Sequence, residues 1–228
     1  MNMKLFWIGL ILPFLGHSQS NPIRLKLMVD VPVQFGVGYE TSSAGRLTGD
    51  FSFGLLTKPN STIILNVMEG FGVDPAVKLM IEDAFESGMV FKTGLNYQMG
   101  KGYLGVHLQH LFLKGEETSR EIVEEVMGED LSSYPRYNRR STQNVVDVSL
   151  KSYLLQVGLS YGYRISVNEQ FEIIPQISFS ANIYSQSSVS SDIRDYATLS
   201  ESVDDYLKDI YHTYAFLPAL SVHLVRRL

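Results

Sequence analysis

The chain has 228 residues, of which 45% are apolar and 19% charged, with a net charge of −5 and no cysteine. This acidic balance gives no support for a nucleic-acid partner, which would favour a basic surface. Without cysteine there is no disulfide, no thiolate nucleophile and no cysteine-based zinc site. The composition fits one globular domain or a chain whose apolar surface is covered in another way.

Residues 1–18 have the pattern of a secretory signal peptide. Lys4 precedes an apolar run from Leu5 to Leu15, and the triplet Gly16-His17-Ser18 follows it. The run is shorter than the ~20 residues that a transmembrane helix needs. We predict cleavage before Gln19, which leaves a mature domain of residues 19–228 without the charge of Lys4. Because no later run is long enough to be a transmembrane helix, a membrane domain would have to be a β-barrel.

The mature chain opens with "RLKLMVDVPVQFGVGYE", Arg24 to Glu40, in which apolar and polar residues alternate. The odd positions are apolar, namely Leu25, Leu27, Val29, Val31, Val33, Phe35, Val37 and Tyr39, and the polar even ones include Lys26, Asp30, Gln34 and Glu40. A period of two predicts a strand with one apolar and one polar face. We interpret the whole stretch as one strand, with Val33 and Phe35 near the middle of a bilayer.

Six further segments alternate in the same way. They are Arg46–Leu56, Met89–Met99, Tyr103–Leu113, Ser152–Ile165, Phe171–Ser185 and Tyr214–Leu228. Short turns at Ser42–Gly45, Gly100–Gly102 and Val167–Glu169 predict three hairpins. Seven strands are therefore evident. Because bacterial barrels have an even number of strands, we place an eighth at Ser61–Gly70, "STIILNVMEG", although its spacing also fits a helix.

The remaining connections are long and acidic. They run from Pro59 to Ser87, from Gly115 to Asp147 and from Gln186 to about Asp209. Each contains a helical pattern, in "DPAVKLMIEDAFESG", "EETSREIVEEVMG" and "LSESVDDYLKDIYHT". With the eighth strand in place, both chain ends and the three short turns lie on one side, and the long connections lie on the other.

A soluble β-sandwich also predicts alternating strands, but three features favour a membrane barrel. The polar face is rich in Gly, Ser, Gln and Asn rather than in Lys and Glu, and the strands match the ~9 to 11 residues that cross a bilayer. Tyrosines gather near strand ends, as interfacial girdles require: Tyr39, Tyr97, Tyr103, Tyr161, Tyr163, Tyr184 and Tyr214. We predict an all-β fold, a closed antiparallel transmembrane β-barrel of eight strands with short helices in the long loops.

The polar face of such a barrel predicts a network of side chains in the lumen. Its candidate members are Lys26, Asp30, Asp50, Lys92, His107, Gln109, Gln156, Glu172 and Gln176. A narrow barrel of eight strands is filled by its own side chains, and charges of both signs can pair there. This mixture disfavours an open diffusion pore.

With its alternating strands, the hairpin "GLNYQMGKGYLGVHLQ" and a last strand that reaches the C-terminus, the mature chain resembles the small outer-membrane β-barrel proteins of Gram-negative bacteria. The signal end "HSQ" resembles those of the Bacteroidota. The resemblance implies contact with outer-membrane lipids and lipopolysaccharide, and insertion by the barrel-insertion machinery through the C-terminal strand; we expect a monomer. The family's last strand usually ends in an aromatic residue, whereas this one ends in Arg226, Arg227 and Leu228.

The histidines are the candidates for catalysis. After cleavage they are His107, His110, His212 and His223. The outer-membrane barrels that the chain resembles include lipid A deacylases, in which a His and a Ser lie close together as "HxS". Here "HLQH" has no Ser at that spacing. By parity His107 faces the lumen and His110 the lipid or its interface. We therefore favour structural histidines over catalytic ones and predict no catalytic residue.

Charged residues of the long loops offer two further candidates. The carboxylates are Glu116, Glu117, Glu121, Glu124, Glu125, Glu129 and Asp130 in one loop and Asp192, Asp195, Glu201, Asp204, Asp205 and Asp209 in another. None has the spacing of an EF-hand, so a solvated acidic face is favoured over weak binding of divalent ions, and we predict no metal or cofactor. Arg136, Arg139 and Arg140 stand among tyrosines and fit either contacts to lipid phosphates or an ordinary loop.

These observations predict a location more strongly than an activity, because adhesins, envelope-stabilising proteins, channels and lipid A-modifying enzymes share this architecture. We predict a structural or surface-interaction role without catalysis. A channel for small solutes or hydrophobic compounds and a lipid A-modifying enzyme are the alternatives.

Overall fold

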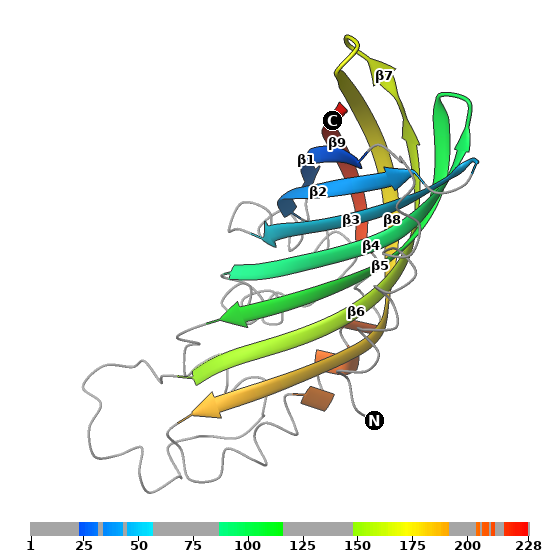
Figure 1. Ribbon diagram of the computed structural model, residues 1–228. Coiled ribbons are helices and arrows are strands. Elements are labelled where there is room, and N and C mark those ends of the chain that lie inside the picture. The colour runs from blue at the N-terminus through cyan, green and yellow to red at the C-terminus, as the bar shows by residue number, and fades with distance from the viewer. Residues whose placement is uncertain are drawn as a thin grey trace, which may run out of the picture.

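The computed structural model describes residues 23–31, 34–42, 45–56, 87–115, 148–191, 204–205, 207–209, 211–212 and 217–227 (Figure 1). Its strands are β1 (Ile23–Val31), β2 (Gln34–Ser42), β3 (Leu47–Leu56), β4 (Ser87–Met99), β5 (Gly102–Gly115), β6 (Val148–Tyr163), β7 (Ile165–Ser166), β8 (Phe171–Ser191) and β9 (Leu217–Arg227). The short β7 continues β6 after Arg164 and pairs with the same neighbour, β8.

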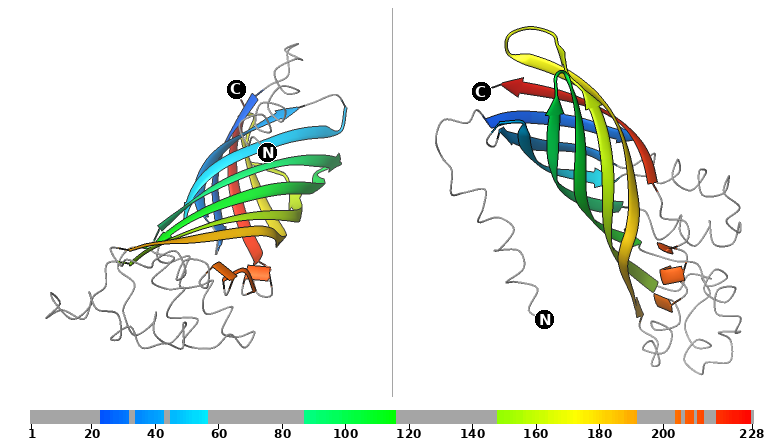
Figure 2. Two further views of the ribbon diagram at one scale, coloured as in Figure 1. Left: turned by 90° about the horizontal axis from the view of Figure 1, so that it is seen from below. Right: turned by 90° about the vertical axis from the view of Figure 1, so that its right-hand side faces the viewer.

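The strands form one closed sheet (Figures 1 and 2). The order β6-β5-β4-β3-β2-β1-β9-β8 is closed by pairing between β6 and β8, and every pairing is antiparallel. With β6 and β7 counted as one, the wall has eight strands. The predicted closed antiparallel barrel of eight strands is thus confirmed.

The interpretation of Arg24–Glu40 as one strand is wrong. The stretch forms the hairpin β1–β2, in which Leu27 pairs with Val37 and Asp30 with Gln34, so the chain reverses between Val31 and Gln34. Each pair joins two odd or two even positions, and the alternation therefore continues through the reversal as it would in one strand. Phe35 pairs with Val29 and therefore lies beside the reversal, in the second position of β2, rather than in the middle of a long strand.

This hairpin also supplies the eighth strand. The ring is closed by strands that pair on both sides, with β1 between β2 and β9 and with β8 between β6 and β9. Ser61–Gly70, the segment proposed for that place, lies outside the described residues. The wall needs no strand from it.

The two ends of the barrel differ in their connections. One end, called the turn end here, carries Ile23, Arg227 and the connections 43–46, 100–101 and 167–170. At the last of these, the Asn168 side chain accepts hydrogen bonds from the backbone N–H groups of Gln170 and Phe171. The opposite end, called the loop end, carries the connection between β1 and β2 and the long connections 57–86, 116–147 and 192–216. The chain ends and three short turns therefore share one side, as predicted.

Exposure alternates along the strands with the apolar side chains outside. Leu159 and Leu220 on the outer wall are 64% and 66% exposed, whereas Gln34 and Gln156 on the inner wall are fully buried. Tyr39, Tyr97, Tyr161, Tyr163 and Tyr184 lie on the outer wall, as expected for girdles. Tyr103 does not, because its odd position in β5 turns it into the lumen, where it is 1% exposed.

A helical segment lies at the loop end before β9. Residues 204–205, 207–209 and 211–212 are helical, as the pattern in "LSESVDDYLKDIYHT" predicts, and Leu207 and Tyr211 are buried. No helix in the described part of the chain is long and apolar enough to cross a membrane. The other two predicted helical pieces lie outside the described residues.

Candidate functional site

The lumen of the barrel is the candidate site, and its turn end holds an ion cluster centred on Arg164. The Arg164 guanidinium donates to Glu40 Oε2 at 2.8 Å and to Glu172 Oε2 at 3.1 Å. Glu172 also pairs with Arg227 and, at 3.6 Å, with Arg24. Both carboxylates are almost fully buried, and a buried charge is stable only when it is paired. The cluster joins β1, β2, β8 and β9 to the junction of β6 and β7.

Tyr103 lies beside this ion cluster. Its hydroxyl donates to Gln176 Oε1 at 2.5 Å, and its ring lies 5.5 Å from the Arg164 guanidinium in a cation–π contact. Gly162, opposite Tyr103 on β6, makes this position possible, because a Cβ there would come within 2.4 Å of the ring. The small residue on one strand thus makes room for the large polar one on the next.

A second group of charges fills the lumen around β1. Lys26 and Asp50 form an ion pair across β1 and β3. Asp30 accepts a hydrogen bond from Gln34 Nε2 at 2.9 Å, and His223 Nε2 lies 3.3 Å from its other oxygen. Lys92, also buried, lies within electrostatic range of Asp30 and Asp50. Charges of both signs therefore alternate through this part of the lumen, as neutralisation in a confined space requires.

Uncharged polar residues lie on the β5, β6 and β8 side of the lumen. His107 Nε2 lies 2.8 Å from Ser180 Oγ, and Gln109 Nε2 donates to Gln156 Oε1 at 3.1 Å. Gly158, between His107 and Ser180 in the sheet, leaves the space for the imidazole, because a Cβ there would come within 2.3 Å of it.

A His–Ser contact is the arrangement from which a nucleophile and its base are built, so its location matters. His107 and Ser180 are each 5% exposed and face the lumen, whereas a lipid substrate would approach from the outer wall. His110 does lie on the outer side, as parity predicted, but neighbouring side chains cover it and its Nδ1 lies 2.6 Å from the Tyr153 hydroxyl. Neither histidine presents a nucleophile to an outer-wall substrate.

The loop end of the lumen is less polar. Leu56, Val90, Leu111, Leu113 and Leu154 on the inner wall there are all buried.

The helical segment lies at this end, beside β6 and β8. The Tyr211 hydroxyl donates to Ser152 Oγ at 3.0 Å, Ser152 bonds Ser187 at 2.9 Å, and the backbone N–H of Ser187 donates to Asp204 at 2.6 Å. Burial raises the pKa of the Tyr211 phenol to about 12. The segment 204–212 is thus anchored to β6 and β8 by hydrogen bonds.

The structure thus places all nine predicted lumen residues on the inner wall and adds others. Glu40, Arg164, Tyr103, Ser180 and His223 were not in the predicted set. Glu40 and His223 were recognisable from strand parity, and Tyr103 from its odd position in β5. Arg164 and Ser180 gave no sign of their partners, because these lie 124 and 73 residues away in the chain. Arg136, Arg139, Arg140 and the carboxylates at 116–130 lie outside the described residues.

Comparisons with known proteins give only distant likenesses. No protein-family model and no curated protein matches the chain. A major outer membrane protein from Thermus thermophilus is similar over 92% of this chain and 100% of its own, at 8% identity and a TM-score of 0.46. CarO2 of Acinetobacter baumannii covers the same shares at 9% identity and a TM-score of 0.38. CarO of Acinetobacter baumannii covers 91% and 97% at 10% identity and a TM-score of 0.39. These likenesses are too distant to carry an argument about function.

Proposed function

We propose that the chain is exported, cleaved before Gln19 and inserted in the bacterial outer membrane as a filled barrel with a structural or surface-interaction role. The observation that carries this proposal is the inverted wall, with large apolar side chains outside and buried ion pairs inside. A soluble barrel would leave the outer wall in water. Lipid instead accepts the apolar face, while paired polar groups fill the interior.

The aromatic residues of the outer wall support the same location. On the joined strand of β6 and β7, Tyr153 lies toward the loop end and Tyr163 at the turn end. Ten residues of strand span ~33 Å, which at a tilt of about 40° corresponds to about 25 Å along the barrel axis. This spacing matches the apolar band of an outer-membrane barrel, which is flanked by aromatic girdles.

Orientation follows from the connections. In outer-membrane barrels the short turns face the periplasm and the longer loops face the outside. We therefore assign the turn end to the periplasm and the loop end, with the connections 57–86, 116–147 and 192–216, to the cell surface. The surface role rests on these long connections, and the C-terminal strand β9 is the segment offered to the insertion machinery of a Bacteroidota-type host.

Fractionation tests the location. The protein should be found in outer-membrane fractions, resist protease there and migrate faster on a gel before boiling than after it. Recovery as a soluble periplasmic monomer would contradict the proposal, because the outer wall would then be in water.

Conductance separates this role from the channel alternative. In the part of the barrel that the structure describes, ion pairs at the turn end and charges around β1 occupy the lumen, and the helical segment is bonded to Ser152 of the inner wall at the loop end. The purified protein should therefore give no steady conductance in planar bilayers. Stepwise currents from the wild-type protein would favour the channel instead.

A further inference from the structure

The inner wall changes character at the loop end. Five buried aliphatic side chains there, called the apolar layer, face the lumen: Leu56, Val90, Leu111, Leu113 and Leu154. Leu111 pairs with Val90 on one side and with Leu154 on the other, so the layer is continuous across β4, β5 and β6. Two residues nearer the turn end, the same three strands carry buried polar side chains: Lys92, Gln109 and Gln156. The interior of an outer-membrane barrel is usually polar, so an apolar layer that faces the lumen needs a reason of its own.

Buried hydroxyl groups border this layer on β6 and β8. Leu113 pairs directly with Ser152, and Ser152 Oγ lies 2.9 Å from Ser187 Oγ; both serines are buried. On the other side of the layer, Leu56 and Leu113 both approach Gly88, where an added Cβ would lie 3.3 Å and 3.0 Å from their side chains. Sites for small molecules combine an apolar lining with a few polar groups, and this end of the lumen has both.

The helical segment brings a phenol to these hydroxyl groups. Tyr211 is buried, and its hydroxyl donates to Ser152 Oγ at 3.0 Å. Leu207 lies one helical turn earlier on the same face and is fully buried. Asp205 and Lys208 of the same segment are charged, pair with each other at 3.5 Å and are exposed. The position of the Tyr211 ring therefore shows what this end of the lumen accepts, which is an apolar ring with one hydroxyl group that reaches a serine.

A second contact ties the start of the segment to the wall. The backbone N–H of Ser187 donates to Asp204 Oδ1 at 2.6 Å, and Figures 1 and 2 show the segment beside the loop-end parts of β6 and β8. A hydrogen bond to a charged acceptor is among the stronger ones. The Asp204 and Tyr211 contacts can both be broken without unpairing a strand, so the segment can leave Ser152 while the barrel stays closed.

We propose that the apolar layer, Ser152 and Ser187 form a binding site for small uncharged phenols, and that the segment 204–212 closes this site until such a ligand binds. The hydroxyl of the ligand donates to Ser152 in place of Tyr211, and its ring lies on Leu113 and Leu154. The segment then swings aside, in the manner of a lid. The site goes beyond the proposed structural role, and it depends on the closed barrel rather than on the location of the protein in the cell.

Equilibrium dialysis of p-cresol and of toluene against the full mature chain in nanodiscs, with binding to empty nanodiscs subtracted, tests the site. p-Cresol should bind more tightly than toluene, which has the same ring without the hydroxyl. Asp204→Ala should bind p-cresol roughly tenfold more tightly than the wild type, because loss of the bond to Ser187 favours the open segment. Ser152→Ala should lose the preference for p-cresol over toluene.

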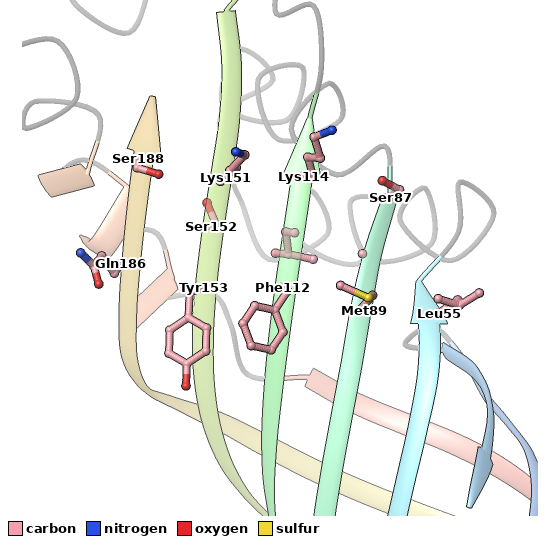
Figure 3. A pocket seen from close by; sticks show the side chains of 12 residues that line it. Leu55, Ser87, Met89, Phe112, Lys114, Lys151, Ser152, Tyr153, Gln186 and Ser188 are labelled. Carbon is pink, nitrogen blue, oxygen red and sulfur yellow. The ribbon is translucent and has the colours of Figure 1, made fainter. Parts of the chain in front are cut away.

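Asp205→Ala is the matched control, because it removes the neighbouring carboxylate, which is exposed and pairs with Lys208 of the segment itself. It should bind p-cresol like the wild type. On the outer side of the same strands, a pocket of about 640 Å³ lined in part by Met89, Phe112 and Tyr153 is the competing place for the ligand (Figure 3). Phe112→Ala should therefore leave binding unchanged. A loss of p-cresol binding in this variant would place the ligand on the outer wall and overturn the site.

Tyr211→Ala gives a second measurement. p-Cresol should raise the urea midpoint of this variant more than that of the wild type, because the ligand then has no side chain to displace. Equal affinity of the wild type and Asp204→Ala for p-cresol, or equal binding of p-cresol and toluene to the wild type, would overturn the site. Gel migration before boiling shows that each variant is folded. Dialysis does not depend on where the cell places the protein, so failure of the site would leave the proposed function standing.

Discussion

The inner and outer walls of this barrel are built from alternate residues of the same strands, yet they follow different rules. On the inner wall charged groups have particular partners, such as Arg164 with Glu40 and Lys26 with Asp50. On the outer wall, Leu27, Val37 and Leu220 are exposed and need only an apolar environment. A substitution on the inner wall should therefore destabilise the barrel by leaving a buried partner unpaired. The cost of a substitution on the outer wall should depend instead on its depth in the membrane.

Removal of Arg164 should have the largest effect of the single changes considered. Arg164→Met leaves Glu40 buried without its cation, and breaking a buried pair in this way costs about 3 to 5 kcal/mol. The midpoint of urea unfolding in vesicles, followed by gel migration before boiling, measures the loss. Adding Glu40→Gln should recover part of it. If Arg164→Met alone costs less than ~1 kcal/mol, the ion cluster does not stabilise the inner wall.

The free-energy cost of an arginine on the outer wall should depend on its depth in the membrane, which sharpens the comparison. Val37→Arg, at the middle of the β1–β2 hairpin, should cost about 2 to 4 kcal/mol. Val167→Arg, at a turn-end position that is 58% exposed, should cost only about 0 to 1 kcal/mol. The same unfolding measurement applies to both. Equal costs would show that the outer wall is not in contact with a bilayer.

The helical segment at the loop end should respond more weakly. Tyr211→Phe removes the hydrogen bond to Ser152 and keeps the ring, so the expected loss is about 1 kcal/mol. Ser152→Ala tests the same contact from the strand. If both variants unfold at the wild-type urea concentration, the segment is not held to the wall by this bond.

The same tyrosine predicts a dependence on alkaline pH. Unfolded, the phenol ionises near pH 10, whereas the folded protein keeps its proton up to a pKa of about 12. The stability from this burial is complete below about pH 10 and is lost as the pH rises toward 12, because the unfolded state releases its proton first. The stability difference between wild type and Tyr211→Phe should therefore shrink over this interval. A constant difference would contradict the assignment.

Strand parity is the part of the structure that sequence patterns predict well, because each residue's side of the wall depends only on its neighbours. It identified Asp30, Gln109 and Glu172 as inward-facing. Contact partners cannot be predicted in this way, because Arg164 contacts Glu40 only when the barrel closes. Tyr103 shows a third case, in which the tendency of tyrosine to lie in girdles is overridden by parity and by the space above Gly162.

The first hairpin was missed because its parity is continuous across the reversal. Pro32 was the available signal, since proline cannot donate a hydrogen bond within a central strand and favours turns. Length was a second signal, because Arg24 to Glu40 as one strand would extend ~55 Å, much more than a tilted strand needs to cross a bilayer.

Single-cysteine labelling along residues 25–40 tests the inverted wall most directly, because the chain has no cysteine of its own. Cysteines at Leu25, Leu27, Val37 and Tyr39 are compared with those at Lys26, Met28, Gln34 and Glu40 in membranes that contain the protein. A lipid-soluble reagent should label the odd positions, most strongly at Leu27 and Val37, and weakly at residues 31–33 where the chain reverses. Labelling of the even positions, or no period of two, would contradict the inverted barrel, and maximal labelling at residues 31–33 would contradict the hairpin.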